Sequence, residues 1–171
     1  MISSILAVIT GLMVFAADRL SKYIVSHTFV LNESKEFING FMDFVYINNP
    51  GAAWGMLSGK TWFLVLLSVV LLIFGIIVFV KYRNRSQLFL WAFTFVVSGG
   101  LGNLFDRIFR KGLVIDFLHF EFWPSFPVFN LADCAICLGA GLLILYFVLD
   151  IIKESKEKSK TKEIDNNNGD Y

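Results

Sequence analysis

The sequence predicts an all-α polytopic membrane protein: four transmembrane helices with a small extracytoplasmic β-sheet and an interfacial helix. The 171 residues are 56% hydrophobic and 17% charged, whereas an ordinary soluble domain is roughly 45–50% apolar and about 25% charged. The chain also contains four apolar stretches, and each reaches or approaches the roughly 20 residues that span a bilayer core. Backbone groups in lipid must be hydrogen-bonded internally, so these stretches are expected to be helices.

The helices and their connections form one expected domain, residues 1–152. Its parts are helices at about 2–24, 61–80, 88–108 and 131–151, and outer-face loops at 25–60 and 109–130. The tail, residues 153–171, mixes Lys with Glu and is expected to be disordered and solvated in the cytoplasm. The first helix is expected to stay uncleaved, because no basic segment precedes it and Phe15-Ala16-Ala17 is a poor signal-peptide cleavage site.

Both termini are predicted to be cytoplasmic. An even number of spans places the two ends in one compartment, and the loop 81–87 is short, basic and free of acids. Lys and Arg are enriched in cytoplasmic loops, and the tail adds further lysines. Basic residues also occur in the opposite loops, but several of those belong to the motifs described below.

The first outer connection is predicted to contain a β-hairpin. Asn39-Gly40 lies between the apolar runs 36–38 and 41–47, and Asn-Gly between such runs is a strong hairpin signal. Trp54 and Trp62 flank the start of the second helix and fit an aromatic belt at the membrane interface. We therefore expect a small sheet and a short amphipathic helix at the membrane surface.

Composition and cysteine spacing argue against several classes of protein. A net charge of +1 lacks the excess of basic residues that nucleic-acid-binding proteins use to bind phosphates. Cys134 and Cys137 have a C-x-x-C spacing, but no thioredoxin-like strand and helix surround them. They are interpreted as small apolar side chains in a helix rather than as a redox pair. Two cysteines alone cannot complete a site of four ligands, so no metal is expected.

Asp116 and Asp133 are the candidate catalytic residues. Each lies among apolar residues beside a predicted span, and an ionisable residue at membrane depth is a functional hypothesis by default. Pro124 and Pro127 lie between them and favour turns that return the chain on itself. If the two carboxylates meet, one must hold a proton at neutral pH. One then acts as a base toward a water while the other donates to a carbonyl oxygen.

Each acid also has a purely structural interpretation. Asn130 is a good helix N-cap, and Asp133 three residues later completes something close to a capping box. Asp116 could be a harmless residue of a short strand at the membrane surface. His27 and His119 have no obvious serine or cysteine nucleophile, so they are interpreted as interfacial side chains.

Two further polar groups occur at the ends of the first and third helices. Asp18 and Lys22 are spaced i,i+4 with the acid first, the favourable orientation on a helix. They form either a surface ion pair or a support for a polar cavity. Asn103, Asp106 and Arg107 follow a glycine-rich stretch that indicates close helix packing and does not match a dinucleotide fingerprint.

The chain resembles the lipoprotein signal peptidase family, also called signal peptidase II, in five motifs that occur in order over nearly the whole chain except the tail. They are Asp18-x-x-x-Lys22; Asn49-Pro50-Gly51-Ala52-Ala53-Trp54-Gly55; Gly99-Gly100-Leu101-Gly102-Asn103-Leu104-Phe105-Asp106-Arg107; Val114-Ile115-Asp116-Phe117; and Phe129-Asn130-Leu131-Ala132-Asp133. Each motif alone is weak, but five in order on a four-span plan are specific. Cys134 and Gly100 depart from the pattern, where serine and alanine are common, and neither touches a proposed proton-transfer group.

The resemblance implies both a fold and an activity. The family has four helices with a small extracytoplasmic sheet over its site, and it cleaves the signal peptide just before a cysteine that carries diacylglycerol. The implied roles are catalytic for Asp116 and Asp133, substrate-binding for Asn49, Gly51, Asn103, Arg107 and Asn130, and supporting for Asp18, Lys22 and Asp106. The expected protein is a monomeric aspartic endopeptidase of the bacterial cytoplasmic membrane. It acts among membrane lipids on lipid-modified preproteins, near the extracytoplasmic face, without metal or cofactor.

Two other functions could use the same carboxylates. A small transporter or proton-relay subunit would use Asp18, Asp106, Asp116 and Asp133 as a chain through the bundle, but these acids cluster toward one predicted membrane face. A metal-dependent membrane hydrolase would need a clustered set of His ligands, which the sequence lacks. Ion flux would support the first alternative, and sensitivity to chelators the second.

Overall fold

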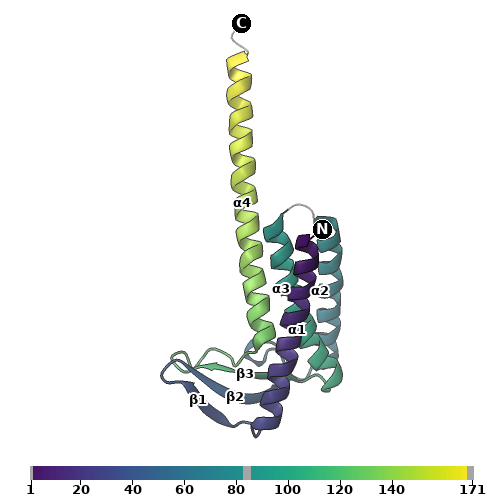
Figure 1. The fold of residues 1–171 in the computed structure, drawn as a ribbon, viewed down its shortest axis with the longest axis vertical. Coiled ribbons are helices and arrows are strands. Elements are labelled where there is room, and N and C mark those ends of the chain that lie inside the picture. The colour runs from purple at the N-terminus through teal and green to yellow at the C-terminus, as the bar shows by residue number, and fades with distance from the viewer. Residues whose placement is uncertain (1, 83–85, 169–171) are drawn as a thin grey trace.

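The computed structural model describes residues 2–82 and 86–168, in which a bundle of four helices carries a three-stranded sheet at one end (Figure 1). The elements in chain order are α1 (Ile2–Thr28), β1 (Ser34–Ile38), β2 (Met42–Asn49), the 3-10 helix η1 (Ala53–Gly55), α2 (Thr61–Tyr82), α3 (Gln87–Phe109), β3 (Val114–Phe120) and α4 (Leu131–Asn168). All four α-helices contain segments long and apolar enough to cross a membrane. The predicted four-span fold with a small sheet is thereby confirmed.

The tail of the chain differs from the sequence-based expectation. Residues from 153 onward were expected to be disordered, whereas α4 continues as one helix to Asn168. Lys and Glu are good helix formers, and extending an existing helix requires no new nucleation. Lys153 and Glu157 add an i,i+4 ion pair, with 3.9 Å between Nζ and Oε1. The charged tail therefore continues the last span as a helix to Asn168, and residues 153–159 of it are exposed.

The prediction that both termini are cytoplasmic rests largely on the basic loop between α2 and α3. This loop was identified as residues 81–87, and residues 83–85 lie outside the part of the chain that the structure describes. On its α3 side, Ser86 caps the helix, and its Oγ accepts the Leu88 N–H at 3.1 Å. The cytoplasmic position of both termini remains a prediction.

α3 lies at the centre of the bundle. It packs against α1, α2 and α4, most extensively against α4. Glycines permit this close approach: a Cβ added at Gly99 would run into the carbonyl oxygen of Ala132, and one at Gly139 would lie 2.6 Å from the carbonyl oxygen of Ala92. The glycine-rich stretch of α3 is thus a helix-packing surface, as the sequence indicated.

The sheet is antiparallel with the strand order β1-β2-β3, and it projects sideways from the end of the bundle (Figure 1). Asn39-Gly40 connects β1 to β2, and Gly40 has a φ of 71°, the left-handed backbone that a tight hairpin turn requires. The predicted hairpin is confirmed. β3 pairs with β2 so that Asp116 lies opposite Ile47.

A small apolar core joins α1 to the sheet. Val25 of α1 packs there with Tyr46, Ile115 and Phe117 from β2 and β3. Successive residues of a strand point to opposite faces, so burying Ile115 and Phe117 on one face directs the intervening Asp116 to the other. The alternation of β3 therefore orients this carboxylate.

The connection between β2 and α2, where a short interfacial helix is expected, contains a short 3-10 helix. The residues between these two elements contain only the three-residue η1. Trp54 and Gly55 have φ angles of 55° and 70°, and left-handed residues cannot continue a right-handed helix. The helix in this connection is therefore only three residues long, because the local backbone turns where a longer helix would have to propagate.

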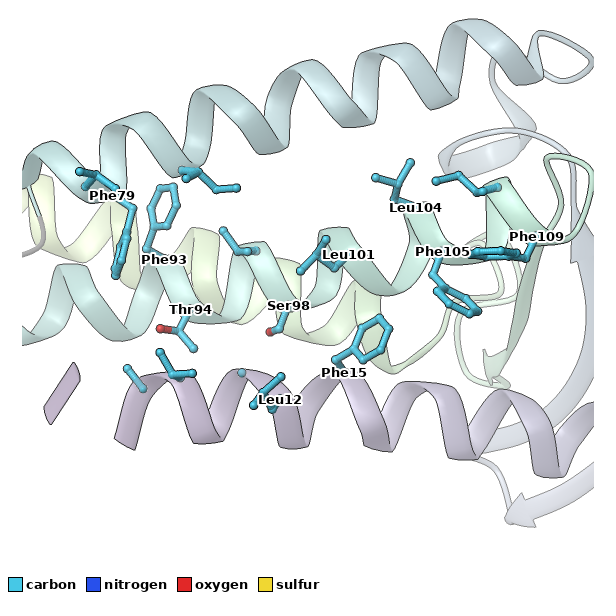
Figure 2. A pocket seen from close by; sticks show the side chains of 17 residues that line it. Leu12, Phe15, Phe79, Phe93, Thr94, Ser98, Leu101, Leu104, Phe105 and Phe109 are labelled. Carbon is cyan, nitrogen blue, oxygen red and sulfur yellow. The ribbon is translucent and has the colours of Figure 1, made fainter. Parts of the chain in front are cut away.

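An apolar groove of about 670 Å³ separates α1 from α2, and α3 forms its floor (Figure 2). Leu12, Phe79 and Leu101 are among the side chains that line it. The hydroxyl groups of Thr94 and Ser98 donate to carbonyl oxygens of α3, those of Leu90 and Phe95 respectively. The groove therefore presents a hydrocarbon surface to the membrane, and it extends along α3 from Phe93 to Phe109.

Candidate active site

Asp116 and Asp133 both lie where the sheet joins the bundle, on either side of Asn130. Asp116 lies in β3, Asp133 lies in the first turn of α4, and Asn130 contacts both. The Asn130 Nδ2 donates to Asp116 Oδ1 at 2.6 Å, and the Asn130 backbone N–H donates to Asp133 Oδ2 at 3.1 Å. Two acids from separate elements of the fold therefore share one neighbour.

The start of α4 explains how Asp133 is held. Asn130 Oδ1 accepts the Asp133 N–H at 3.0 Å while Asp133 Oδ2 accepts the Asn130 N–H, which is the reciprocal pattern of a capping box. The capping interpretation is confirmed. It leaves Asp133 Oδ1 available to Asn103 of α3, whose Nδ2 donates to that oxygen at 2.7 Å.

Asp116 is also held through both of its oxygens. Asn49, the last residue of β2, donates from Nδ2 to Asp116 Oδ2 at 2.8 Å, and Asn130 donates to Oδ1. Each of the four carboxylate oxygens of the pair thus accepts one N–H. An ionised carboxylate has about four acceptor sites, so each oxygen keeps capacity for a proton or a water.

Burial is the main influence on the titration of Asp116, which is only 2% exposed. Removal from water raises the pKa of Asp116 to about 7, and the nearby Asp133 carboxylate contributes to the rise. The hydrogen bonds from Asn49 and Asn130 oppose it by favouring the ionised form. Near neutral pH, Asp116 is therefore suited to hold a proton beside a second acid.

Arg107 of α3 ties the loop after β2 to the bundle. Its Nη2 donates to the carbonyl oxygen of Gly51 at 3.2 Å, and the Gly51 N–H donates to Asn49 Oδ1 at 2.9 Å. A Cβ at Gly51 would lie 2.6 Å from the carbonyl oxygen of Met56, so the turn has no room for a side chain. The loop that carries Asn49 is thereby fixed beside Asp116.

Four charged side chains form a closed ring beneath the carboxylate pair: Asp18, Arg19 and Lys22 of α1 and Asp106 of α3. Lys22 Nζ lies 3.1 Å from Asp18 Oδ1 and 2.9 Å from Asp106 Oδ2. Arg19 bridges the same two acids, with 2.7 Å at each contact. The i,i+4 pair predicted from the sequence is present, but it is buried rather than on the surface, since Lys22 is only 2% exposed. We call these residues the charge ring.

The charge ring is linked to the carboxylate pair through Asn103. Lys22 Nζ donates to Asn103 Oδ1 at 3.0 Å, and the Asn130 Nδ2 contacts the same oxygen at 3.1 Å. The ten residues singled out in the sequence therefore form one network of hydrogen bonds and ion pairs: Asp18, Lys22, Asn49, Gly51, Asn103, Asp106, Arg107, Asp116, Asn130 and Asp133.

Sequence reasoning missed Arg19, because the motif Asp18-x-x-x-Lys22 leaves that position unspecified. Its partner Asp106 is 87 residues away in the chain, and no local pattern links the two. The only signal was a cation next to Asp18 near the end of an apolar span, where a charge needs a partner.

The other reactive side chains lie outside this network. His27 contacts the Tyr23 carbonyl, and His119 is 3.7 Å from Asp43. Cys134 and Cys137 are free thiols exposed on α4, so they face outward instead of packing inside the bundle. Within residues 2–82 and 86–168, no group of three or more His, Cys, Asp or Glu side chains is arranged to hold a metal ion.

The fold and this site define a polytopic membrane protein with a pair of carboxylates, Asp116 buried and Asp133 half-buried, at one end of its bundle. Residues 10–149 match the family model described as signal peptidase (SPase) II, and the chain belongs to that family. It is therefore a protease of bacterial membranes, and family membership indicates processing of lipoprotein signal peptides. The family suggested by the five motifs is confirmed.

Individual relatives agree with the family assignment. The lipoprotein signal peptidase of Desulfitobacterium hafniense is 39% identical over 145 residues, which cover 84% of this chain and 93% of the relative. The one from Enterococcus faecalis is 36% identical over 133 residues, 78% of this chain and 81% of the relative. A solved structure of a bacterial membrane enzyme matches with a TM-score of 0.80 at 32% identity, over 85% of this chain and 88% of that chain.

Proposed function

We propose that this protein is an aspartic endopeptidase that removes the signal peptide from diacylglyceryl-modified prolipoproteins, cutting just before the lipidated cysteine. The observation that carries the proposal is the pair Asp116 and Asp133, a buried and a half-buried carboxylate bridged by Asn130. Such pairs share one proton because like charges in close contact cannot both ionise cheaply. A shared proton supplies one base and one acid for amide hydrolysis.

The proposed reaction uses the pair in two steps. Asp133 takes a proton from a water whose oxygen attacks the scissile carbonyl carbon, while protonated Asp116 donates its proton to the carbonyl oxygen. The tetrahedral intermediate then collapses: the C–N bond breaks, the leaving nitrogen receives the proton from Asp133, and Asp116 regains its own. The pKa of about 7 for Asp116 supports giving it the resting proton. No metal or cofactor takes part.

The remaining residues of the network are assigned to binding and support. Asn49, Gly51, Asn103, Arg107 and Asn130 are proposed to contact the substrate backbone, and Asp18, Lys22 and Asp106 to keep the pocket organised. We further propose that the site lies near the extracytoplasmic face with both termini in the cytoplasm, and that the protein acts as a monomer. The apolar bundle around the site suits a substrate that arrives laterally from the membrane as a signal helix with acyl chains.

The arrangement of acids favours a peptidase over a proton relay. A relay needs ionisable groups spread through the depth of the membrane. Here Asp18, Asp106, Asp116 and Asp133 belong to one network at the sheet end of the bundle. The acids are thus gathered around one point, as a site of chemistry requires.

The test uses purified protein in lipid and a lipidated precursor peptide, with the unlipidated peptide alongside. Asp116→Asn and Asp133→Asn should each lower turnover by at least about 10²-fold, the smaller end of general acid–base contributions. Asp43→Asn is the matched control, because Asp43 lies in the same sheet but contacts only His119 among the ionisable groups of the described chain; it should keep parental turnover. Retained turnover in either variant of the pair rejects the proposal, as does proton flux through proteoliposomes that the same variants abolish.

A further inference from the structure

We propose that Arg19 is a positioning residue for the carboxylate pair and acts through Asp18 and Asp106. This inference rests on the proposed two-aspartate function. The hydrogen bonds and ion pairs of its guanidinium go to Asp18 and Asp106, and none goes to Asp116 or Asp133. Its effect on chemistry would therefore be indirect and would depend on what the two ring acids hold.

The guanidinium of Arg19 bridges α1 and α3. Its Nη2 donates to Asp18 Oδ2 on its own helix, and its Nη1 donates to Asp106 Oδ1 on α3, each at 2.7 Å. Charge-assisted bonds of this length are strong, and the planar fork fixes the orientation of both acids. Lys22 joins the same acids through their other oxygens, so the charge ring is closed and formally neutral.

Each ring acid also holds the backbone directly before one member of the pair. Asp18 Oδ1 accepts the N–H of Ala132, the residue before Asp133, at 3.1 Å. Asp106 Oδ2 accepts the N–H of Ile115, the residue before Asp116, at 3.4 Å. The distance between the two ring acids therefore sets where β3 and α4 present their carboxylates, and Arg19 spans that distance.

The surroundings of Arg19 favour a guanidinium over other side chains. Its Cζ lies 4.9 Å from the ring centroid of Phe105 and 5.8 Å from that of Phe15, so the planar group rests against aromatic faces. The side chain is 20% exposed, and its fork reaches two acids at once. The single amine of a lysine would retain the charge but could not reproduce the fork.

The positive charge of Arg19 should also affect the ionisation of the carboxylate pair, which a residue that acts by packing alone would not do. The charged and titratable groups around the pair, besides Asp116 and Asp133 themselves, are Asp18, Arg19 and Lys22 from α1, Asp106 and Arg107 from α3, and the Cys134 thiol next to Asp133 on α4. Removing Arg19 alone would leave the charge ring with a net negative charge beneath the pair. A nearby anion disfavours ionised carboxylates, so the pH profile of turnover should move to higher pH.

The experiment compares Arg19→Gln, Arg19→Lys and the parent in lipid with the lipidated precursor peptide, measuring kcat, KM and the pH dependence of kcat. Misplacement of reacting groups by about 1 Å can reduce rates on the order of 10²-fold. We expect Arg19→Gln to lower kcat by about 10- to 100-fold, to leave KM within about twofold, and to shift the pH profile upward. Arg19→Lys should recover part of kcat and keep the parental pH profile. Arg110→Lys, a change to another half-buried arginine at the same end of α3 but outside the charge ring, should match the parent.

Parental kcat in both Arg19 variants overturns the proposal, and so does a loss that falls entirely on KM. A loss in Arg19→Gln with no shift of the pH profile and no recovery in Arg19→Lys also overturns it, because that pattern indicates packing alone. If Arg19→Gln does not fold, Arg19→Lys decides: reduced kcat at the parental pH profile supports positioning, and parental kcat refutes it. A parent that fails to cleave the lipidated peptide contradicts the proposed function itself, whereas an active parent with unaffected Arg19 variants contradicts only this inference.

Discussion

α1 and α3 meet in two different ways along their length. At the sheet end they are joined by the charge ring, in which Asp18, Lys22 and Asp106 are each at most 2% exposed. On the side toward α2, the same helices border an open apolar groove of about 670 Å³ (Figure 2). One pair of helices is therefore held by buried ion pairs near the carboxylate pair, whereas the groove between α1 and α2 offers an apolar surface to lipid.

The difference follows from the free energy that each kind of contact would lose if the two helices separated. Buried ions cannot be separated at low dielectric without several kcal/mol of uncompensated charge, so the charge ring holds its partners closely. Apolar side chains gain little by leaving lipid for another helix, because lipid tails are as apolar as leucine. The positions of the side chains are thus fixed most tightly around the carboxylate pair, and the rest of the bundle needs only to span the membrane.

The largest expected effect comes from opening the charge ring. Lys22→Met would leave Asp18 and Asp106 to share Arg19 alone, and removing one partner of a buried ion network typically costs about 3–5 kcal/mol. We expect the free energy of unfolding to fall by that amount in detergent-based unfolding measurements. Lys35→Met, which removes an exposed cation of the sheet paired with Glu33, should change it by less than about 1 kcal/mol. Equal effects of the two changes would contradict the contrast drawn between buried and exposed charge.

A second effect should appear on changing pH. The pKa of Asp116 is about 7 in the folded protein against 3.8 for a free aspartate, so the folded state binds more protons between these values. Its contribution to stability is therefore present at low pH and is lost as the pH rises through about 7, by up to about 1.4 kcal/mol per pH unit. Thermal unfolding of the parent and of Asp116→Asn from pH 5 to pH 8 measures this, because the variant lacks the group. Parallel pH dependence in both proteins would show that burial does not perturb Asp116.

The smallest expected effect on stability concerns two helix glycines, one tightly packed and one in open space. A Cβ at Gly102 would lie 2.7 Å from Asp18 Oδ2 and 3.1 Å from the Cβ of Ala132, whereas a Cβ at Gly141 would meet nothing within 4 Å. Gly102→Ala should lower the free energy of unfolding by about 1–3 kcal/mol through overpacking. Gly141→Ala should raise it by about 0.5–1 kcal/mol, because alanine is the better helix former. If the two variants behave alike, packing at the sheet end is no tighter than elsewhere.

Several features of this protein could be read from local sequence. The four spans follow from runs of apolar residues, the hairpin from Asn39-Gly40, and the cap of α4 from Asn130 and Asp133. Each of these depends on interactions within a few residues of the chain. The pairing of Asp116 with Asp133 was expected from the family motifs, and their common contact with Asn130 agrees with that expectation.

Local sequence failed where neighbouring residues left more than one outcome open. The charged tail had the composition of a solvated segment, yet it continues α4 to Asn168 because the preceding helix supplies the nucleus. The amphipathic connection after β2 became the short η1, because Trp54 and Gly55 adopt left-handed backbone. In both places the adjoining structure selected the conformation.

By itself, the sequence determined that the chain crosses the membrane four times, since the length and apolarity of a segment decide whether it can replace water with lipid. It also placed polar residues at the ends of those segments. Only the tertiary structure decided that Arg19 and Lys22 of α1 would meet Asp106 of α3, and that this ring would hold the backbone before each carboxylate of the pair. Ion pairs form between groups close in space, and distance along the chain does not reveal which groups those are.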